Sequence, residues 1–463
     1  MRDFILKGTK FKWNKVKKII TLSLIQLIKM PFALAQTNVD STKDSKWNSH
    51  FQLTVISQNH LAFSALYSGK NSLSDSSEWG ATSITSTLFL GRKLWKGGAF
   101  YLNPEISGGE GLSYSQGVAG ALNGETYRVG NPTPRLFIAR AYFQQQIPLG
   151  NSSYENVEDD VNQIKDKVPV NRITINAGKF AISDFYDDNK YSHDPRTQFL
   201  NWSLMANGAW DYPANTRGYT YGIVTELIKP KWAIRLSSVA VPKIANAPQM
   251  EYNITKAHSE TIEFERKIVL NKKPGDIRFT ISDTHSRAPS YAEGLKAIED
   301  NDTYLLNVIS GKAEGDVYGG KKFGLGFSAD QELNNEIGIF MRAGWNDGKD
   351  VTWAFTEIDQ TLSEGISLKG IRWNRPTDVF AIASVINGIS APHRDFLAAG
   401  GYGFIIGDGK LNYGHEGIIE CYYNAFLSTY LWLTLDYQFV NNPAYNKDRG
   451  PVNVFAVRGH VAF

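Results

Sequence analysis

The sequence lacks cysteine pairs and an excess of charge of one sign. Cys421 is the one cysteine among 463 residues, which excludes a framework of intrachain disulfides. The 49 Lys and Arg side chains are nearly balanced by 46 Asp and Glu side chains. A chain with neither a basic field nor an acidic tail is a poor candidate for binding nucleic acid.

Long hydrophobic runs are also missing. The apolar stretch at 19–28 is closed by Lys29 and Pro31, well short of the roughly 20 residues that a membrane-spanning helix needs. No later stretch is long enough either. Because lipid tolerates only helices and closed barrels, any residence in a membrane requires a β-barrel.

The N-terminal region has the pattern of a secretory signal. Seven Lys and Arg residues precede the apolar stretch, and small residues follow it at Ala33 and Ala35. This order of charge, apolar core and small residues predicts export with cleavage after Ala35. We therefore expect a signal peptide at 1–35, a periplasmic segment at 36–48 and a folded region at 49–463.

Motifs for catalysis are absent. The sequence contains no G-x-S-x-G elbow and no H-E-x-x-H, and its eight histidines do not cluster along the chain. Glu263 and Glu265 stand two apart in a predicted strand, where lumen charges are a better interpretation than a glycosidase pair. We expect no enzymatic activity and no cofactor, and the hypothesis of an outer membrane lipase or protease lacks a nucleophile and base.

The chain is rich in glycine and aromatic residues and carries sixteen alternating or apolar runs after residue 49. A two-residue period is typical of strands with one apolar and one polar face. The runs are 49–67, 79–95, 98–109, 134–148, 171–181, 217–228, 231–241, 257–270, 276–287, 321–332, 335–345, 361–373, 378–388, 415–425, 429–440 and 453–463.

The links between these runs alternate in length. Short links such as 96–97 and 229–230 alternate with long ones such as 110–133 and 182–216, with one exception at 149–170. In a soluble β-sandwich nothing requires short and long links to alternate, whereas a membrane barrel has short turns on one side and long loops on the other. The fold class predicted is all-β: a transmembrane antiparallel β-barrel of about 16 strands, with short periplasmic turns and long external loops.

The last run shows the expected faces. Phe455, Val457 and Phe463 share one face, and Arg458 and His460 share the other. Charges buried in a sandwich core would cost several kcal/mol each, whereas a wide barrel offers them an aqueous lumen. We therefore expect the apolar face to meet lipid and Arg458 and His460 to meet water.

Several stretches resemble the carbohydrate-selective porin family of Gram-negative outer membranes, the OprB-like porins. The similarity covers nearly all of the chain after the signal peptide, and 441–451 is its most specific part. The stretches are 413–416 (YGHE), 420–423 (ECYY), 436–438 (DYQ), 442–446 (NPAYN), 448–451 (DRGP), 198–201 (QFLN), 211–216 (DYPANT) and 373–376 (WNRP).

This resemblance implies a barrel in the outer membrane that passes monosaccharides such as glucose by facilitated diffusion, through a constriction of charged and aromatic side chains. It implies small sugars and outer membrane lipid as partners. The terminal strand resembles the signal that the outer membrane assembly machinery recognises. The sequence does not determine whether the chain forms a homo-oligomer. Two other hypotheses remain: a general diffusion porin, and a nonconducting barrel that serves as an adhesin.

Sugar recognition needs aromatic rings for the apolar ring faces and charged or amide groups for the hydroxyls. The link at 182–216 follows the fifth run, and in sixteen-stranded porins generally that loop narrows the lumen. We hypothesise that it forms the constriction, with further contacts from the wall. The candidates are Asp187, Trp202, Trp210, Tyr212 and Arg217 in or next to the link, and Arg140, Arg278, Glu420, Asp436 and Arg458 on the wall.

A metal site in this link is not expected. Asp187 and Asp188 lie near His193 and Asp194, but no EF-hand spacing accompanies them. Acidic residues in loops of such proteins are usually solvated.

Overall fold

The computed structural model describes residues 46–126 and 133–463, and the statements below concern these residues. The predicted signal peptide at 1–35 lies outside them, as does most of the predicted periplasmic segment at 36–48. Lys46 to the C-terminus forms one compact unit.

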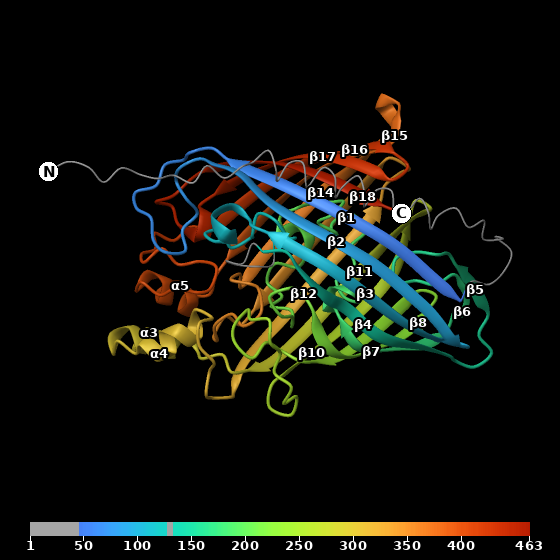
Figure 1. The fold of residues 1–463 in the computed structure, drawn as a ribbon, viewed down its shortest axis with the longest axis horizontal. Coiled ribbons are helices and arrows are strands. Elements are labelled where there is room, and N and C mark those ends of the chain that lie inside the picture. Colours follow the sequence, from blue (N-terminus) through green and yellow to red (C-terminus); the bar gives the residue numbers. More distant parts are fainter. Residues whose placement is uncertain (1–45, 127–132) are drawn as a thin grey trace, which may run out of the picture. The chain divides into compact units, whose positions relative to one another are not determined.

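Sixteen antiparallel strands close into a barrel (Figure 1). Each of the sixteen predicted runs overlaps one barrel strand, so the predicted fold class is confirmed. The barrel strands are β1 (Trp47–His60), β2 (Glu78–Trp95), β3 (Gly98–Gly109), β4 (Arg135–Pro148), β7 (Arg172–Phe180), β8 (Thr220–Lys229), β9 (Trp232–Val239), β10 (His258–Leu270), β11 (Lys273–Ser286), β12 (Gly320–Glu332), β13 (Ile337–Asn346), β14 (Gln360–Gly370), β15 (Arg375–Gly388), β16 (Glu416–Ser428), β17 (Leu431–Asn441) and β18 (Val452–Ala462).

The last strand closes the barrel by pairing with the first. The N–H of Phe51 donates to the carbonyl of Phe463 at 2.8 Å, and their rings lie 5.1 Å apart. Phe455 and Val457 point outward and are 45% and 44% exposed. The outer face is therefore apolar, as the period-two pattern predicts.

Along β18 the inner face does not meet an open aqueous lumen. Residues 182–216, which we call the inner link, fold inside the barrel after β7, its fifth strand. The guanidinium of Arg458 is fully buried and donates to the carbonyls of Pro195 and Gln198 at 2.8 and 2.7 Å. The expectation that Arg458 and His460 face water is therefore wrong: both point inward, but the packed interior covers them.

The inner face of β15 is apolar for the same reason. Ala381, Ala383 and Val385 are buried in one cluster with Phe199 of the inner link. A wall segment that a folded link covers gains from apolar contact, so β15 lacks the polar face of its neighbours.

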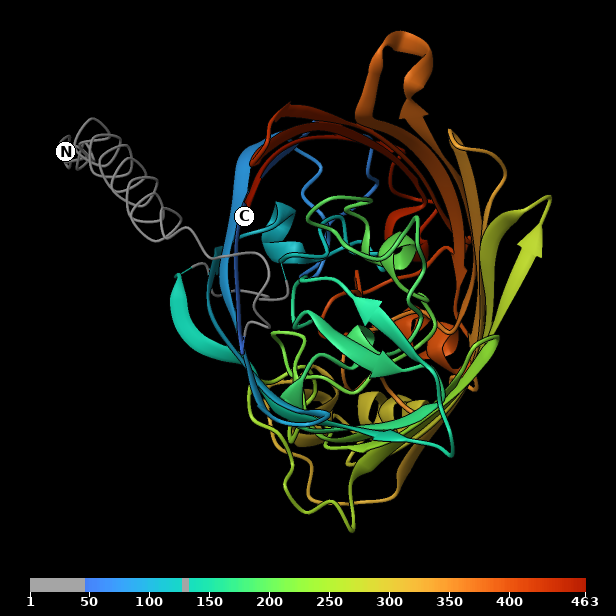
Figure 2. The same cartoon turned by 90° about the vertical axis from the view of Figure 1, so that its right-hand side faces the viewer.

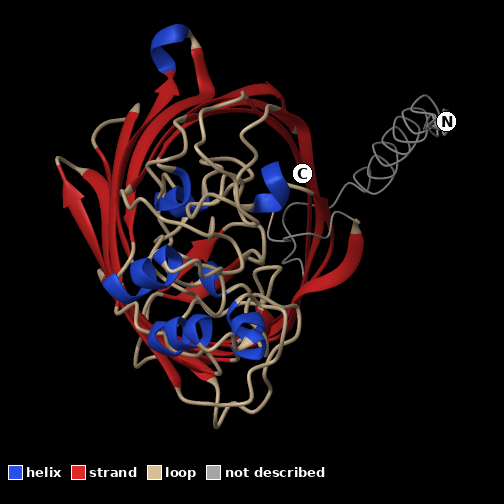
Figure 3. Ribbon diagram, turned by 90° about the vertical axis from the view of Figure 1, so that its left-hand side faces the viewer, coloured by secondary structure: helices blue, strands red, loops and turns tan. Residues whose placement is uncertain are grey.

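Helices of the long external loops lie at one end of the barrel (Figure 3). The loop after β11 contains α3 (Tyr291–Glu299) and α4 (Thr303–Ile309), and the loop after β15 contains α5 (Ala391–Ala398). The ring of Tyr291 stacks on His393 of α5 with centroids 4.3 Å apart. Within the described part of the chain, no helix is long and apolar enough to cross a membrane.

The exceptional link at 149–170 forms a separate hairpin. Its strands, β5 (Tyr154–Val157) and β6 (Asp166–Pro169), pair with each other and are not part of the barrel sheet. Viewed from the end with the short turns, the hairpin lies within the ring of barrel strands (Figure 2).

Asp211 joins the inner link to the external loop between β13 and β14. Its buried carboxylate accepts hydrogen bonds from four consecutive backbone N–H groups, at 353–356, over 2.7 to 3.3 Å. A carboxylate that satisfies several buried donors at once stabilises both segments that it joins.

We expect Asp211→Ala to destabilise this packing by roughly 3 kcal/mol, because the buried donors lose an ionised acceptor. Chemical unfolding followed by tryptophan fluorescence measures the effect, since Trp202, Trp210 and Trp353 are buried in the same cluster. Asp395→Ala is the matched control because the Asp395 side chain is 61% exposed. Equal unfolding midpoints for the two variants would contradict the prediction.

Candidate functional site

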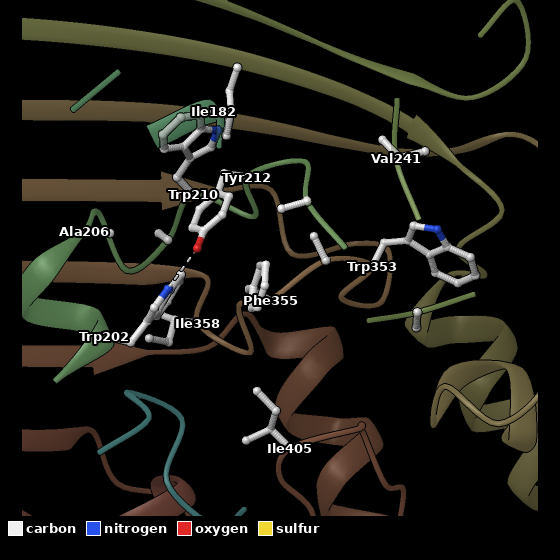
Figure 4. Packing of buried hydrophobic residues seen from close by; sticks show 14 of the residues in the cluster. Ile182, Trp202, Ala206, Trp210, Tyr212, Val241, Trp353, Phe355, Ile358 and Ile405 are labelled. Atoms are coloured by element: carbon white, nitrogen blue, oxygen red, sulfur yellow. Dashed lines mark hydrogen bonds between the residues drawn. The ribbon is translucent and has the colours of Figure 1, made fainter. Parts of the chain in front are cut away.

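The aromatic residues of the inner link form a core. Trp202, Trp210 and Tyr212 are only 3%, 6% and 3% exposed (Figure 4). Nε1 of Trp202 donates to the Tyr212 hydroxyl at 3.5 Å, and the Tyr212 ring lies 5.1 Å from that of Phe355. Their ring faces are covered, so they give the link its shape and offer little surface to a passing solute.

Asp187 also holds the link in place. Its carboxylate accepts from Nε of Arg342 on β13 at 2.8 Å and from the backbone N–H of Asn207 at 2.8 Å. Arg342 is fully buried and donates further to the carbonyls of Leu204 and Ser192. This pair fixes two distant parts of the link to one wall strand.

Glu420 and Asp436 lie under the same link. Glu420 is fully buried and accepts from the backbone N–H groups of Leu200 and Asn201 at 2.5 and 2.9 Å. Asp436, 5% exposed, has an oxygen 3.5 Å from Nε2 of Gln438. Glu420 therefore belongs to the contact between wall and link, and Asp436 is buried on the wall next to Gln438 of its own strand.

A charged cluster lies between the inner link and strands β2, β3 and β8. Nε of Arg196 is 3.2 Å from both oxygens of Glu125, and Nη2 is 3.2 Å from Glu105. The hydroxyl of Tyr219 donates to Glu105 at 3.1 Å. Burial raises the pKa of Glu125 more than Arg196 lowers it. The guanidinium of Arg196 is fixed by these contacts and by Gln52 and Thr87.

Three cations surround the other side of this cluster. Arg217 lies over the Phe137 ring at 4.0 Å, and Lys179 and Arg140 lie over the Tyr219 ring at 5.9 and 5.4 Å. Arg140 is paired with Asp184 through two hydrogen bonds of 2.6 Å. Nη1 of Arg217 has no hydrogen-bond partner among the described residues. Burial and the nearby Arg135 lower the pKa of Arg217.

The groups of this cluster line a narrow cavity. Its volume of about 30 Å³ holds one or two water molecules. The lining residues are Thr85, Glu105, Ser107, Gly108, Gly109, Glu125, Thr126, Arg196, Arg217 and Tyr219. Here the barrel interior is constricted by charged groups and by Tyr219.

A second cavity, which we call the inner cavity, lies toward the short turns. Its volume of about 530 Å³ is in the range of small-molecule sites. Strand β3 lines the inner cavity near Gly98 and Tyr101 and the narrow cavity near Glu105, so the two follow each other along one wall. Arg235 in the inner cavity is held by Glu226, Glu263 and Glu265 at 3.1, 3.0 and 2.6 Å.

The hairpin at 149–170 forms one side of the inner cavity. Nδ2 of Asn48 donates to the carboxylate of Asp159 at 2.7 Å, and Lys93 pairs with Asp166 at 2.6 Å. Nδ2 of Asn103 donates to Asn162 at 2.9 Å. These contacts tie the hairpin to β1, β2 and β3. The mouth with the short turns is therefore narrowed by an insertion as well as by the wall.

The sequence-predicted residues divide into two groups. Arg217 and Arg140 lie at the charged cluster, and Arg278, paired with Asp330 at 2.8 Å, lines the inner cavity. The other candidates are buried on the wall, where link and wall meet, or in the core of the link: Asp187, Trp202, Trp210, Tyr212, Glu420, Asp436 and Arg458.

Sequence reasoning missed Glu105, Glu125, Arg196 and Tyr219 as one cluster. They come from β3, the loop before β4, the inner link and the residue just before β8, so no spacing along the chain relates them. The one available signal was Glu105, an acidic residue on the inner face of a predicted strand.

Comparison with known proteins gives a family and a fold. Residues 80–463 match the family described as "Carbohydrate-selective porin, OprB family". The high-pH structure of Pseudomonas putida OprB is similar with a TM-score of 0.62 at 15% identity, over 90% of this chain and 94% of that one. The outer membrane channel DcaP of Acinetobacter baumannii aligns with a TM-score of 0.48 at 9% identity, over 91% and 99% of the two chains. No curated protein matches the sequence.

Replacing 151–169 by a short Gly-Ser turn should enlarge the mouth, because the hairpin fills space beside the inner cavity. We expect single-channel conductance to rise, with the barrel itself intact. Planar-bilayer recording of the refolded variant measures this. A variant in which only Lys165, whose side chain is 61% exposed, is replaced by Ala serves as the control. An unchanged conductance after the deletion would show that the mouth does not limit flow.

Proposed function

The chain belongs to the OprB family of carbohydrate-selective porins and is an outer membrane channel, through which we propose that monosaccharides such as glucose pass by facilitated diffusion. The observation that supports this finer assignment is the succession of a narrow charged cavity and a wider inner cavity along β3. The narrow cavity is the proposed constriction. The inner cavity is the proposed exit chamber.

The chemistry of the narrow cavity suits a sugar. Glu105 and Glu125 can accept hydrogen bonds from hydroxyl groups, and Arg217 can donate to a hydroxyl oxygen. Tyr219 and Phe137 supply aromatic surface next to these groups. A neutral ring with several hydroxyls satisfies both charge signs, whereas an ion would meet attraction from one side and repulsion from the other.

Passage requires a side chain to move, because the narrow cavity is smaller than any sugar. Arg196 is fixed by two carboxylates, whereas Arg217 contacts the Phe137 ring and has no ion pair among the described residues. We assign the gating movement to Arg217. The aromatic core of the inner link, with Trp202, keeps the shape of the link fixed during this movement.

The inner cavity serves as a second, weak site. Arg278 and Arg235 are each paired with carboxylates there, so a solute meets polar groups that already have partners. Conduction favours several weak sites over one strong site, because a tightly held solute does not leave.

Export and insertion into the outer membrane involve the two ends of the chain. Residues 1–35 direct export, and β18 with Phe463 is the element that the outer membrane assembly machinery recognises. The apolar outer face meets lipid. Association into homo-oligomers would use this same outer face.

A general diffusion porin is the second candidate, favoured by the presence of both charge signs in the constriction. Liposome swelling with glucose, a disaccharide and an amino acid of similar size separates the two. Faster entry of glucose than of the amino acid supports a sugar-tuned constriction. Equal rates contradict it, and no swelling would favour an adhesin.

Arg217→Ala should weaken sugar recognition and widen the passage. We expect the affinity for glucose, measured as block of ion current, to fall about 10-fold, because one charge-assisted hydrogen bond is lost. Open-channel conductance should rise at the same time. Arg372→Ala is the matched control, since the Arg372 side chain is 73% exposed on a short turn. A variant with unchanged block and conductance would remove Arg217 from the constriction.

A further inference from the structure

Two histidines and two carboxylates meet on the outer wall of the barrel. His258 begins β10 and is paired in register with His285 near the end of β11, and Glu260 is paired with Asp283. The next outward-facing pair, Ile262 and Ile281, is 46% and 45% exposed and belongs to the apolar outer face. The cluster therefore lies at the external rim, just beyond the apolar band.

The ligand atoms of this group are close together. One ligand atom each of His258, Glu260 and His285 lies within 4.8 Å of the others. Nε2 of His258 is 3.3 Å from Oε1 of Glu260, and the two imidazole rings stack with centroids 4.9 Å apart. Two ligands on one tetrahedral zinc ion are about 3.3 Å apart, so rotation of these partly exposed side chains suffices to close the group.

Hydrogen bonds to acceptors fix one nitrogen of each ring. Nδ1 of His258 lies 2.7 Å from the carbonyl of Ile254, and Nε2 of His285 lies 3.0 Å from Oδ2 of Asp283. Carbonyl and carboxylate oxygens only accept, so Nδ1 of His258 and Nε2 of His285 carry the protons. In the neutral rings the lone pairs are then on Nε2 of His258 and Nδ1 of His285.

This arrangement leaves the lone pair of His258 facing a carboxylate oxygen at 3.3 Å. A proton on this nitrogen or a metal ion can satisfy the contact, and the nearby His285 supplies a further ligand that only a metal ion would use. Rings that donate their other N–H to a carbonyl or carboxylate are also the usual form of metal-ligating histidines, because the second bond orients the ring.

We propose that His258, His285 and Glu260 form a binding site for a divalent transition-metal ion of the zinc class, with Asp283 as the positioning residue of His285. Two imidazoles and a carboxylate are the donor set that zinc, nickel and copper prefer over calcium or magnesium. The site joins β10 to β11 at the point where the long loops 240–257 and 287–319 leave the barrel.

A metal ion here would stabilise the rim of the barrel and leave the channel interior untouched. The carbonyl of Ile254 extends the link to the loop before β10. Because the cluster is on the outer wall and the proposed constriction is inside, the two proposals can fail independently.

The experiment uses untagged mature protein, refolded in detergent, because a histidine tag would itself bind zinc. Zinc chloride is titrated in competition with a chromophoric chelator. We expect one zinc ion per chain, and at least a roughly 100-fold loss of affinity in the His258→Ala/His285→Ala double variant. Asp283→Asn should weaken binding about 10-fold, the effect typical of a group that orients a ligand.

His415→Ala is the matched control, an exposed histidine outside the cluster that should leave zinc affinity unchanged. Calcium chloride in place of zinc should not compete. Zinc binding of equal strength in the double variant would overturn the proposal, as would wild-type protein that binds no zinc. The altered side chains lie on the outer surface, and an unchanged far-ultraviolet circular dichroism spectrum confirms that each variant is folded.

Discussion

The structure depends on hydrogen bonds between charged wall side chains and the backbone of the inner link. Glu420 accepts from two N–H groups, Arg458 donates to two carbonyls, and Arg342 donates to two more while it pairs with Asp187. A buried charge without partners would cost several kcal/mol, so each wall charge needs the link in this one position. The narrow cavity exists because the link is held there.

The barrel could be predicted from the sequence because its pattern is local. Alternation within each run and the parity of link lengths depend on neighbouring residues, and both follow from a sheet that has lipid on one side. The two-residue period also predicts correctly that Phe463, which pairs with Phe51 where the barrel closes, lies on the outer face. The resemblance to carbohydrate-selective porins is confirmed by the family match.

The interior could not be predicted in the same way. Period two shows that Glu420 and Arg458 point inward, but it does not show whether water or protein covers them. The aromatic residues of the link were candidates because sugars stack on rings, yet Trp202 and Tyr212 pack on each other. Glu105, Arg196 and Tyr219 meet only through the fold. His258 and His285 likewise meet only because β10 and β11 pair in one register.

The wall recognises main-chain atoms of the link at Leu200, Asn201, Pro195 and Gln198, and most of these bonds do not depend on which side chains the link carries. Substitutions in the link can therefore alter what its exposed side chains present to the passage while the anchoring bonds persist. The barrel wall can therefore stay the same during evolution while the sequence of the inner link changes. New selectivities can arise in a barrel of this kind without any change to the strands that cross the membrane.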